Sequence, residues 1–245
     1  MQTGSFLEIL DSVDSTNNYA MARVREGMAK HGMAFIAKEQ TAGKGQRGKS
    51  WQMEAGKNIA MTLVLKTDML RAEEQFYLSM LIALGVSDLL KNKAGESITI
   101  KWPNDIYWRD RKAGGILIET VIQGSKWKWA VVGIGININQ TQFDPSLPNP
   151  VSLKEITGKE HDVIELAKAL YQFVMKRVEP IAEQSPARVL EEYNNHLYKI
   201  GETVKLKKAN AVFETSIKGV SMMGQLRTVD TMERHFDFGE VEWVI

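Results

Sequence analysis

The chain has 245 residues, a formal net charge of +1 and no cysteine. This length suits one large domain with a small appendage. The absence of cysteine excludes disulfides and thiolate metal sites, and the near-neutral charge argues against duplex DNA binding through a basic surface. The sequence has no apolar run of about 18 residues and no signal-peptide pattern at its N-terminus. We therefore expect a cytoplasmic protein with no membrane partner and no DNA partner.

The first third of the sequence predicts a helix and two strands around a glycine-rich loop. A helix is expected to begin at the motif DSTN, residues 14–17, whose side chains can cap free backbone amides, and to cover residues 19–28. Strands are expected over 33–40 and 58–65, and a long, mostly buried helix over 72–92. The glycine-rich loop therefore lies between two strands.

The rest of the sequence predicts hairpin strands, helices and a final group of short strands. Strands are expected over 98–102, 105–108, 115–122 and 127–139, before a proline-bearing loop over 143–150. Helices are expected over 162–183, with a kink at Pro180, and over 186–197. Short strands are expected over 203–207, 212–220, 225–229, 236–238 and 242–245. The arrangement indicates an α+β fold with a small barrel-like C-terminal appendage.

The most informative segment is the run QTAGKGQRGKSW, residues 40–51. Its glycines permit positive φ angles and close approach of the backbone to a ligand. Lys44, Arg47 and Lys49 supply positive charge along the same loop, and Trp51 offers a flat apolar cover. The pattern predicts a loop that closes over an anionic ligand. Taken alone, a solvated basic surface loop explains it equally well.

The same run contains the spacing Gly43-x-Gly45-x-x-Gly48, which matches the dinucleotide-binding fingerprint literally. That fingerprint requires a helix directly after the glycines, so that the helix N-terminus meets a pyrophosphate. Here a strand is expected instead, so the glycines do not lead into a helix N-terminus. Residues 43–50 also match the Walker pattern G-x-x-x-x-G-K-S literally, but a phosphate-binding Walker loop likewise leads directly into a helix. The context argues against both sites.

A second motif, KWPND at residues 101–105, precedes Lys112 and the run AGGILIE at 113–119. Pro103 fixes φ and favours a turn, which places Asn104 and Asp105 near a strand end. Asp105 could bind Mg²⁺, and Lys112 could face an anion. Each piece alone is equally explained by a hairpin turn and a surface lysine.

Together these motifs resemble the biotin protein ligases, also called biotin–[acetyl-CoA-carboxylase] ligases. The family motif K-W-P-N-D matches residues 101–105 without change, and the loop pattern G-R-G-R-x-G-R-x-W is matched by GKGQRGKSW at 43–51. The family pattern R-K-x-x-G-I-L-x-E is matched at 111–119, and GIGIN at 133–137 resembles its G-x-G-x-N segment. The resemblance covers residues 11 to about 139.

The resemblance implies a catalytic core related to class II aminoacyl-tRNA synthetases over 1–198 and a small SH3-like domain over 199–245. It implies biotin and ATP as substrates, with Mg²⁺, and a biotin carboxyl carrier protein as the acceptor. Biotin first forms biotinyl-5′-AMP, and a lysine of the acceptor then takes the biotinyl group. The acceptor's identity and the oligomeric state, monomer or homodimer, stay open.

The resemblance also implies roles for individual residues. The expected catalytic residues are Lys112, which contacts the biotin carboxylate, Asp105, which is also the expected Mg²⁺ ligand, and Arg47. The expected biotin-binding residues are Ser15, Thr16, Asn17, Gln40, Gly43, Lys44, Gly45, Gln46, Trp51, Lys112 and Gly115. The expected nucleotide-binding residues are Arg47, Lys49, Asn104 and Asn137. Among these, Asn137 is expected at the adenine.

Two departures from the family's larger members are expected to matter. Gln46 stands where the family commonly has its second arginine, which helps to retain the adenylate. Glutamine can form hydrogen bonds but carries no charge, so we expect weaker adenylate retention unless Arg47 compensates. Because the DSTN motif begins 14 residues into the sequence, we expect a short form without the N-terminal DNA-binding domain of the larger members.

Two alternatives to a biotin ligase stay open. A lipoate–protein ligase or octanoyltransferase has the same core fold and also modifies a carrier lysine. The loop at 43–51 and the motif at 101–105 argue against it. A biotin-binding regulator with slow turnover is the second alternative. The presence of Lys112, Asp105 and the cationic loop argues against this one.

Overall fold

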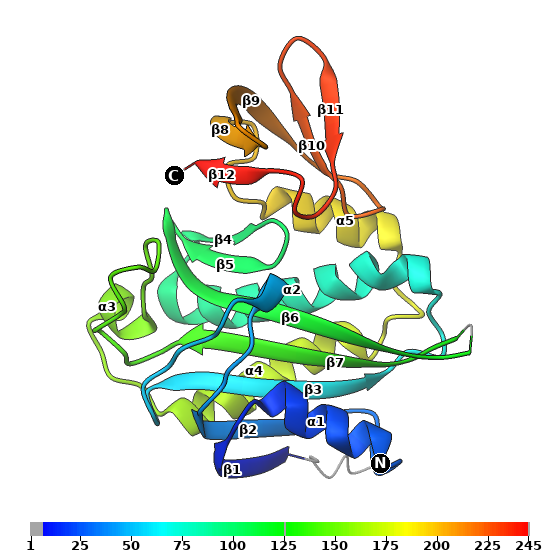
Figure 1. Cartoon of the computed structure of the whole chain (residues 1–245), viewed down its shortest axis with the longest axis vertical. Coiled ribbons are helices and arrows are strands. Elements are labelled where there is room, and N and C mark those ends of the chain that lie inside the picture. The colour runs from blue at the N-terminus through cyan, green and yellow to red at the C-terminus, as the bar shows by residue number, and fades with distance from the viewer. Residues whose placement is uncertain (1–6, 125, 245) are drawn as a thin grey trace.

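The structure is a computed structural model that describes residues 7–124 and 126–244. Its larger part is a seven-stranded mixed sheet in the order β1-β2-β3-β7-β6-β5-β4 (Figure 1). The strands are β1 (Leu7–Val13), β2 (Met33–Gln40), β3 (Asn58–Lys66), β4 (Ile98–Lys101), β5 (Asp105–Trp108), β6 (Arg111–Gln123) and β7 (Lys126–Asn137). β1 and β2 are parallel, and the other neighbours pair in antiparallel fashion.

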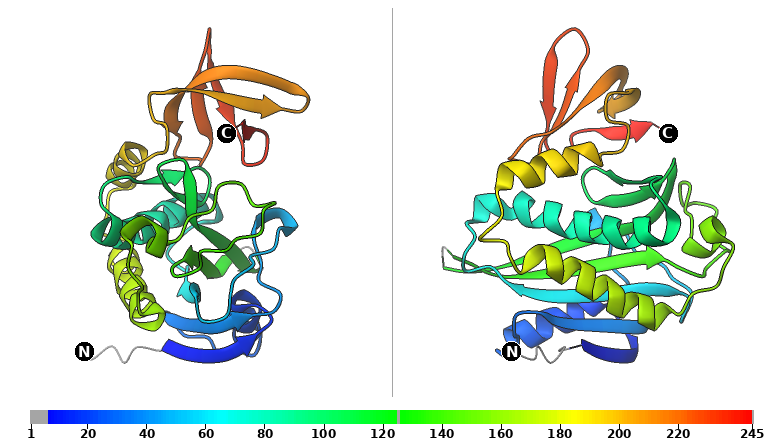
Figure 2. Two further views of the ribbon diagram at one scale, coloured as in Figure 1. Left: turned by 90° about the vertical axis from the view of Figure 1, so that its left-hand side faces the viewer. Right: turned by 180° about the vertical axis from the view of Figure 1, so that it is seen from behind.

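Helices pack on both faces of this sheet, because its central strands are apolar on both faces. α2 (Gln75–Ala94) and α4 (Val163–Val178) lie on one face (Figure 2, right), and α1 (Thr16–Arg25) lies on the other. Successive strand residues point to opposite faces. Val132 accordingly belongs to the main core with α2 and α4, whereas Val131 packs in a smaller cluster with α1. A slip of one residue would exchange these two faces, so the packing fixes the strand register.

A short helix, α5 (Pro186–Asn195), leads into a second, five-stranded antiparallel sheet in the order β11-β10-β9-β8-β12 (Figure 1). Its strands are β8 (Thr203–Lys208), β9 (Ala211–Val220), β10 (Leu226–Val229), β11 (Glu233–Phe236) and β12 (Glu242–Val244). The predicted α+β fold with a small C-terminal β unit is confirmed. The expected boundary between residues 198 and 199 falls between α5 and β8 and stays a prediction.

Several element boundaries differ from the expectation. Pro180 does not kink a helix, because α4 ends at Val178 and the proline follows that end. α1 begins at Thr16, within the DSTN motif as expected, but it ends at Arg25 rather than at residue 28. β11 ends at Phe236, where the expected strand began. Residue 245, the expected end of the last strand, lies outside the described residues. No helix in the described ranges is both long enough and apolar enough to cross a bilayer.

Two elements carry no clear signal in the sequence. β1 is an edge strand whose side chains are mostly exposed, so its residues do not alternate between apolar and polar. α3 (Leu153–Thr157) is only five residues long, and its start is fixed by a capping box between Ser152 and Glu155. β1 is defined by its pairing with β2 and α3 by its capping box, and neither shows a hydrophobic period.

Candidate active site

The floor of the site is a patch of small residues in the middle of the large sheet. Strand pairing places Ala60 of β3 beside Gly135 of β7, and Gly135 beside Gly115 of β6. Gly133 lies two residues before Gly135 and therefore points to the same face. Ile136, the residue after Gly135, points to the opposite face and is buried in the main core. The segment GIGIN, residues 133–137, thus packs one face against the core under α2 and α4 and leaves its other face open toward the site.

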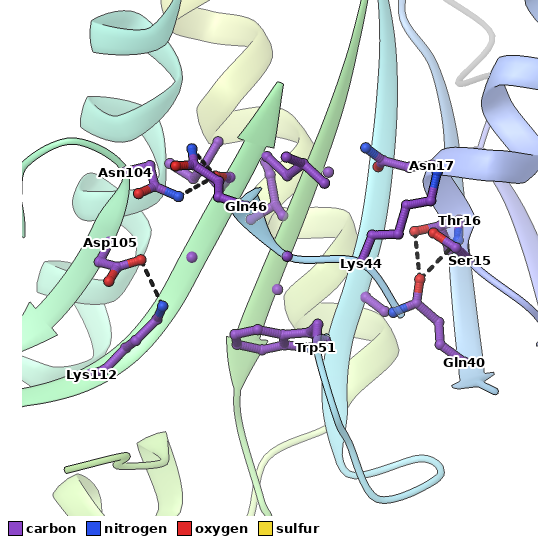
Figure 3. A pocket seen from close by; sticks show the side chains of 18 residues that line it. Ser15, Thr16, Asn17, Gln40, Lys44, Gln46, Trp51, Asn104, Asp105 and Lys112 are labelled. Atoms are coloured by element: carbon purple, nitrogen blue, oxygen red, sulfur yellow. Dashed lines mark hydrogen bonds and ion pairs between the residues drawn. The ribbon is translucent and has the colours of Figure 1, made fainter. Parts of the chain in front are cut away.

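A cavity of about 490 Å³, part of it open to solvent, lies above this floor. The start of α1, the loop after β2, the β5–β6 hairpin and strands β3 and β7 contribute its lining (Figure 3). The lining residues are Ser15, Thr16, Asn17, Gln40, Lys44, Gly45, Gln46, Trp51, Ala60, Asn104, Asp105, Lys112, Gly115, Ile116, Leu117, Gly133, Ile134 and Gly135.

One end of the cavity is built from the first turn of α1 and the end of β2. Ser15 is the N-cap residue, as the DSTN motif suggests, but its side chain makes no capping hydrogen bond. Instead, the backbone N–H and the hydroxyl of Thr16 donate to Gln40 Oε1 at 2.8 and 3.0 Å. Gln40 thereby satisfies the first backbone amide of α1, and its side chain is held at the helix start. This end of the cavity therefore presents fixed, polar hydrogen-bonding groups.

Glu119 of β6 fixes the next residue of α1 and also the loop. Asn17 Nδ2 donates to Glu119 Oε2 at 2.8 Å, and Thr62 Oγ1 donates to Asn17 Oδ1 at 2.6 Å. A β-carbon at Gly133 would lie 2.3 Å from Asn17 Oδ1, so only glycine leaves room for this amide. Lys44 Nζ lies 3.8 Å from Glu119 Oε1. Glu119 thus connects the helix start to the cationic loop.

The opposite end of the cavity carries an ion pair on the β5–β6 hairpin. Lys112 Nζ lies 2.7 Å from Asp105 Oδ1, and both side chains are only partly buried. A β-carbon at Gly115 would lie 3.5 Å from Lys112 Nζ and 3.4 Å from Asp105 Oδ1, within ordinary contact. The Lys112 backbone is held by its N–H, which donates to Asn149 O at 2.7 Å. A partly exposed ammonium in a fixed position is suited to bind a ligand carboxylate or phosphate.

The loop over 43–51 covers the cavity between these two ends (Figure 3). Trp51 N–H donates to Gly43 O at 2.8 Å, and a β-carbon at Gly43 would lie 2.3 Å from Trp51 O. The Trp51 ring lies against Gly135 of the floor. Among the described residues, buried Gln46 Oε1 and Trp51 Nε1 have no hydrogen-bond partner. Buried polar atoms are normally paired, so these two atoms indicate a site for a polar ligand.

Four predicted site residues lie outside the described lining of the cavity. Gly43 supports Trp51 from the loop backbone, and Lys49 accepts a hydrogen bond from Gly45 N–H at its carbonyl oxygen. Arg47 Nη1 donates to Gly239 O at 3.3 Å. Asn137 Nδ2 is buried and donates to a backbone carbonyl oxygen, that of Val151, at 3.2 Å. The predicted contacts of Arg47 and Lys49 with phosphates and of Asn137 with adenine stay predictions.

Other lining residues had no assigned role in the sequence analysis. Ala60 and Ile134 come from strands. Glu119 lies outside the lining but contacts Asn17 and Lys44, and no function was predicted for it although it belongs to a quoted motif. Gly133 and Gly135 carried a usable signal, since glycines two residues apart in a strand leave one face open. Glu119 carried none, because its contact with Asn17 joins positions 102 residues apart.

A metal ion would find few protein ligands here. In the part of the chain that the structure describes, no three His, Asp or Glu side chains gather in a group that could hold a metal ion. Asp105 supplies one carboxylate beside the cavity, and its Oδ1 contacts Lys112. Mg²⁺ in nucleotide sites commonly takes one or two carboxylates and completes its shell with phosphate oxygens and water. Asp105 fits Mg²⁺ only in that shared arrangement.

Comparisons with known proteins show the family of this chain. Residues 9–137 match the model of the biotin/lipoate A/B protein ligase family. The chain belongs to this family. One similar protein is the biotin–[acetyl-CoA-carboxylase] ligase of Paracoccus denitrificans. It is 30% identical over 227 residues, which are 89% of this chain and 92% of that protein. The bifunctional ligase/repressor BirA of Escherichia coli is 29% identical over 225 residues, or 91% of this chain and 69% of that protein.

Solved structures of the family have the same fold. The biotin protein ligase from Aquifex aeolicus in complex with biotin and ATP superimposes with a TM-score of 0.81 at 26% sequence identity. The match covers 96% of this chain and 97% of that chain. The C-terminal sheet therefore belongs to the shared architecture as well. The predicted resemblance to the biotin protein ligases is confirmed.

Proposed function

We propose that this chain is an ATP-dependent ligase that attaches biotin to a specific lysine of a biotin carboxyl carrier protein through biotinyl-5′-AMP. The observation that carries the proposal is the chemical layout of the cavity. Hydrogen-bonding groups at Thr16 and Gln40 lie at one end, Lys112 lies at the other, and the glycine floor lies between them (Figure 3). Biotin has the matching layout of a polar ureido head, an aliphatic chain and a terminal carboxylate.

In the first half-reaction a carboxylate oxygen of biotin attacks the α-phosphorus of ATP. A carbonyl–oxygen–phosphorus bond forms, and pyrophosphate leaves. Two anions must approach each other, so a fixed cation at their meeting point lowers the barrier. Lys112 is such a cation. Its Nζ lies 2.7 Å from Asp105 Oδ1, which holds the ammonium at the end of the cavity. Lys112 binds and orients the carboxylate, and Trp51 and Gln46 keep water from the site.

In the second half-reaction the amine of the acceptor lysine attacks the acyl carbon of the mixed anhydride. An amide bond forms, AMP leaves with the bonding electron pair, and the amine loses a proton. Lys112 faces the departing phosphate as it earlier faced the carboxylate. Both attacking atoms belong to substrates, so this chemistry requires no nucleophilic side chain.

The nucleotide side of the site involves the remaining predicted residues. Mg²⁺ bound with ATP would neutralise phosphate charge, and Asp105 is the residue placed to share its coordination. Arg47 and Lys49 face the phosphates after a movement of the loop, since Arg47 contacts Gly239 in the present arrangement. Asn104, whose Nδ2 donates to Ile116 O at 2.7 Å, borders the same end of the cavity.

A transfer assay tests this function. The protein is incubated with a biotin carboxyl carrier domain, Mg²⁺, ATP and either biotin, lipoate or octanoate, and the acceptor is analysed by mass spectrometry. The expected result is ATP-dependent addition of one biotinyl group, lost when the acceptor lysine is replaced by arginine. Preferential transfer of lipoate or octanoate would assign the chain to that branch of the family. Adenylate formation with no transfer to any carrier would favour a biotin-binding regulator.

A further inference from the structure

The loop over 43–51, called the ligand loop from here on, contacts the C-terminal sheet through one side chain. Arg47 has a φ angle of 54°, in the left-handed region, and its guanidinium lies outside the described cavity lining. Its Nη1 donates to Gly239 O at 3.3 Å, and its Cζ lies 5.8 Å from the ring centroid of Phe238. A cation at that distance from an aromatic ring is attracted to its face. The two partners belong to a segment 192 residues further along the chain.

Gly239 favours glycine by its backbone conformation, and an added β-carbon would displace the Arg47 guanidinium. Its φ angle of 84° is one that residues with a β-carbon rarely adopt. A β-carbon there would also lie 2.3 Å from Arg47 Nη1. The backbone at Gly239 is therefore shaped to receive the guanidinium.

Residues 237–240, called the terminal turn, are themselves held in place. Asp237 N–H donates to Glu240 Oε2 at 2.9 Å, and Lys208 Nζ lies 3.1 Å from Glu240 Oε1. The Phe238 ring packs edge-on against Trp102, with centroids 6.4 Å apart. Trp102 belongs to the motif KWPND, whose Asn104 and Asp105 line the cavity. The terminal turn is thus connected to the catalytic motif on one side and to the ligand loop on the other.

We propose that Phe238 and Gly239 are positioning residues that hold the ligand loop closed over the cavity through Arg47, an inference that rests on the proposed ligase function. Gln46 directly precedes Arg47 and lines the cavity, and Trp51 follows four residues later. Restraining Arg47 therefore restrains both cavity-covering side chains. The C-terminal sheet in this way slows the exit of biotin before ATP binds, although neither positioning residue lines the cavity.

The first test measures the ligand loop without any ligand. Amide hydrogen exchange at residues 46–50 is compared between the unmodified protein, Phe238→Ala and Gly239→Ala. The expected result is faster exchange at these amides in both variants. Gly201→Ala is the matched control for Gly239→Ala, because Gly201 also has a positive φ, 76°, and no atom within 4 Å of an added β-carbon. Met232→Ala is the control for Phe238→Ala, since both side chains are at least half exposed on the C-terminal sheet region.

The second test measures the release of biotin in the absence of ATP, so that contacts between Arg47 and phosphates do not contribute. Phe238→Ala and Gly239→Ala are expected to release biotin about three- to tenfold faster, the effect of losing one cation–π contact or one hydrogen bond to a charged group. The double variant Arg47→Ala with Gly239→Ala is expected to release biotin no faster than Arg47→Ala alone. Such non-additivity is the signature of two residues that act through one contact.

The two tests separate this proposal from the proposed function. If the unmodified protein binds no biotin, the ligase function fails, and with it the proposed role in biotin release. If it binds biotin but the variants exchange and release at the rates of the unmodified protein, the positioning role is wrong and the function stands. Equal acceleration in the Gly201→Ala and Met232→Ala controls would also overturn the positioning role, because it would assign the effect to general loosening of the C-terminal sheet.

Discussion

The indole of Trp51 occupies the space that a β-carbon on Gly135 would need, since the added atom would lie 2.5 Å from Trp51 Cε2. The distance is well below a van der Waals contact, so the pair forms only when position 135 is glycine. The ligand loop therefore rests on the floor of the cavity through one ring and one backbone position. Because the Trp51 ring and Gly135 are so close, substitution of Gly135 directly tests whether the loop is closed in this way.

Gly135→Ala is expected to displace Trp51 and weaken biotin binding by about tenfold, because overpacking typically costs about 1–3 kcal/mol. Isothermal titration with biotin measures the change. If the conflict with the ring is the cause, adding Gly135→Ala to Trp51→Ala should have little further effect. An equal tenfold loss in both backgrounds would contradict the steric explanation.

Lys112→Ala is expected to lower the rate of adenylate formation by a factor of about 10²–10³, the usual effect of one well-placed group that stabilises developing charge. Pyrophosphate release in single-turnover conditions measures it. Lys168→Ala is the matched control, because Lys168 also pairs with a carboxylate at 2.7 Å but lies on α4, on the opposite face of the sheet. Near-normal adenylate formation in Lys112→Ala would remove this lysine from the mechanism.

Gln46→Arg is expected to reduce the release of biotinyl-5′-AMP, because arginine would add a charge next to the adenylate phosphate. At present Gln46 Nε2 reaches Ile116 O only at 3.4 Å, and the buried Oε1 has no partner among the described residues. Release is measured as steady-state adenylate production without an acceptor. Gln123→Arg adds the same charge at an exposed strand end and controls for general electrostatics. An unchanged release rate would contradict the weaker adenylate retention expected from Gln46.

Lys101, which is buried between the catalytic motif and the C-terminal sheet, predicts how the free energy of unfolding changes with pH. Its ammonium lies 4.6 Å from the Tyr107 ring centroid and 5.4 Å from that of Trp243 on β12, and the residue is only 8% exposed. Burial lowers the pKa of Lys101 to about 8, and the positive charge of Lys112 adds to this effect, whereas Asp105 opposes it. In the unfolded chain the pKa returns to an ordinary value near ~10.4.

Between these two pKa values the unfolded chain binds more protons than the folded protein. The free energy of unfolding therefore rises with pH over this window, and the cost of burying the charge is fully present below about pH 8. From pH 7 to ~9.5 the unmodified protein should gain about 2 kcal/mol relative to Lys101→Met, which cannot titrate. Urea unfolding of both proteins measures the difference. A constant difference across this range would contradict the lowered pKa.

The sequence predicted the loop, the motif at 101–105 and most elements because their signals are local. Glycine spacing, a proline turn and hydrophobic periods all act within a few residues. The hydrogen bonds that finish the site join distant segments. Gln40 caps the helix that begins at Thr16, and Glu119 holds Asn17 from another strand. Neither pairing leaves a pattern in one sequence, because glutamine and glutamate are common in strands and loops of every kind.

The predicted roles of Arg47 and Asn137 show the same limit. Family position assigns both residues to the nucleotide, whereas in the structure their side chains donate hydrogen bonds to backbone carbonyl oxygens. Position in a motif identifies which residues gather near a site. It does not specify which partner each side chain has before the substrates arrive.

The most direct test of the account is a crystal structure of the protein with biotin. We predict one biotin in the cavity. Its ureido head should lie near Thr16 and Gln40, and its carboxylate should lie within hydrogen-bonding distance of Lys112 Nζ. The ligand loop should remain closed, with Trp51 on Gly135. A biotin bound in the reverse direction, or outside this cavity, would contradict the account.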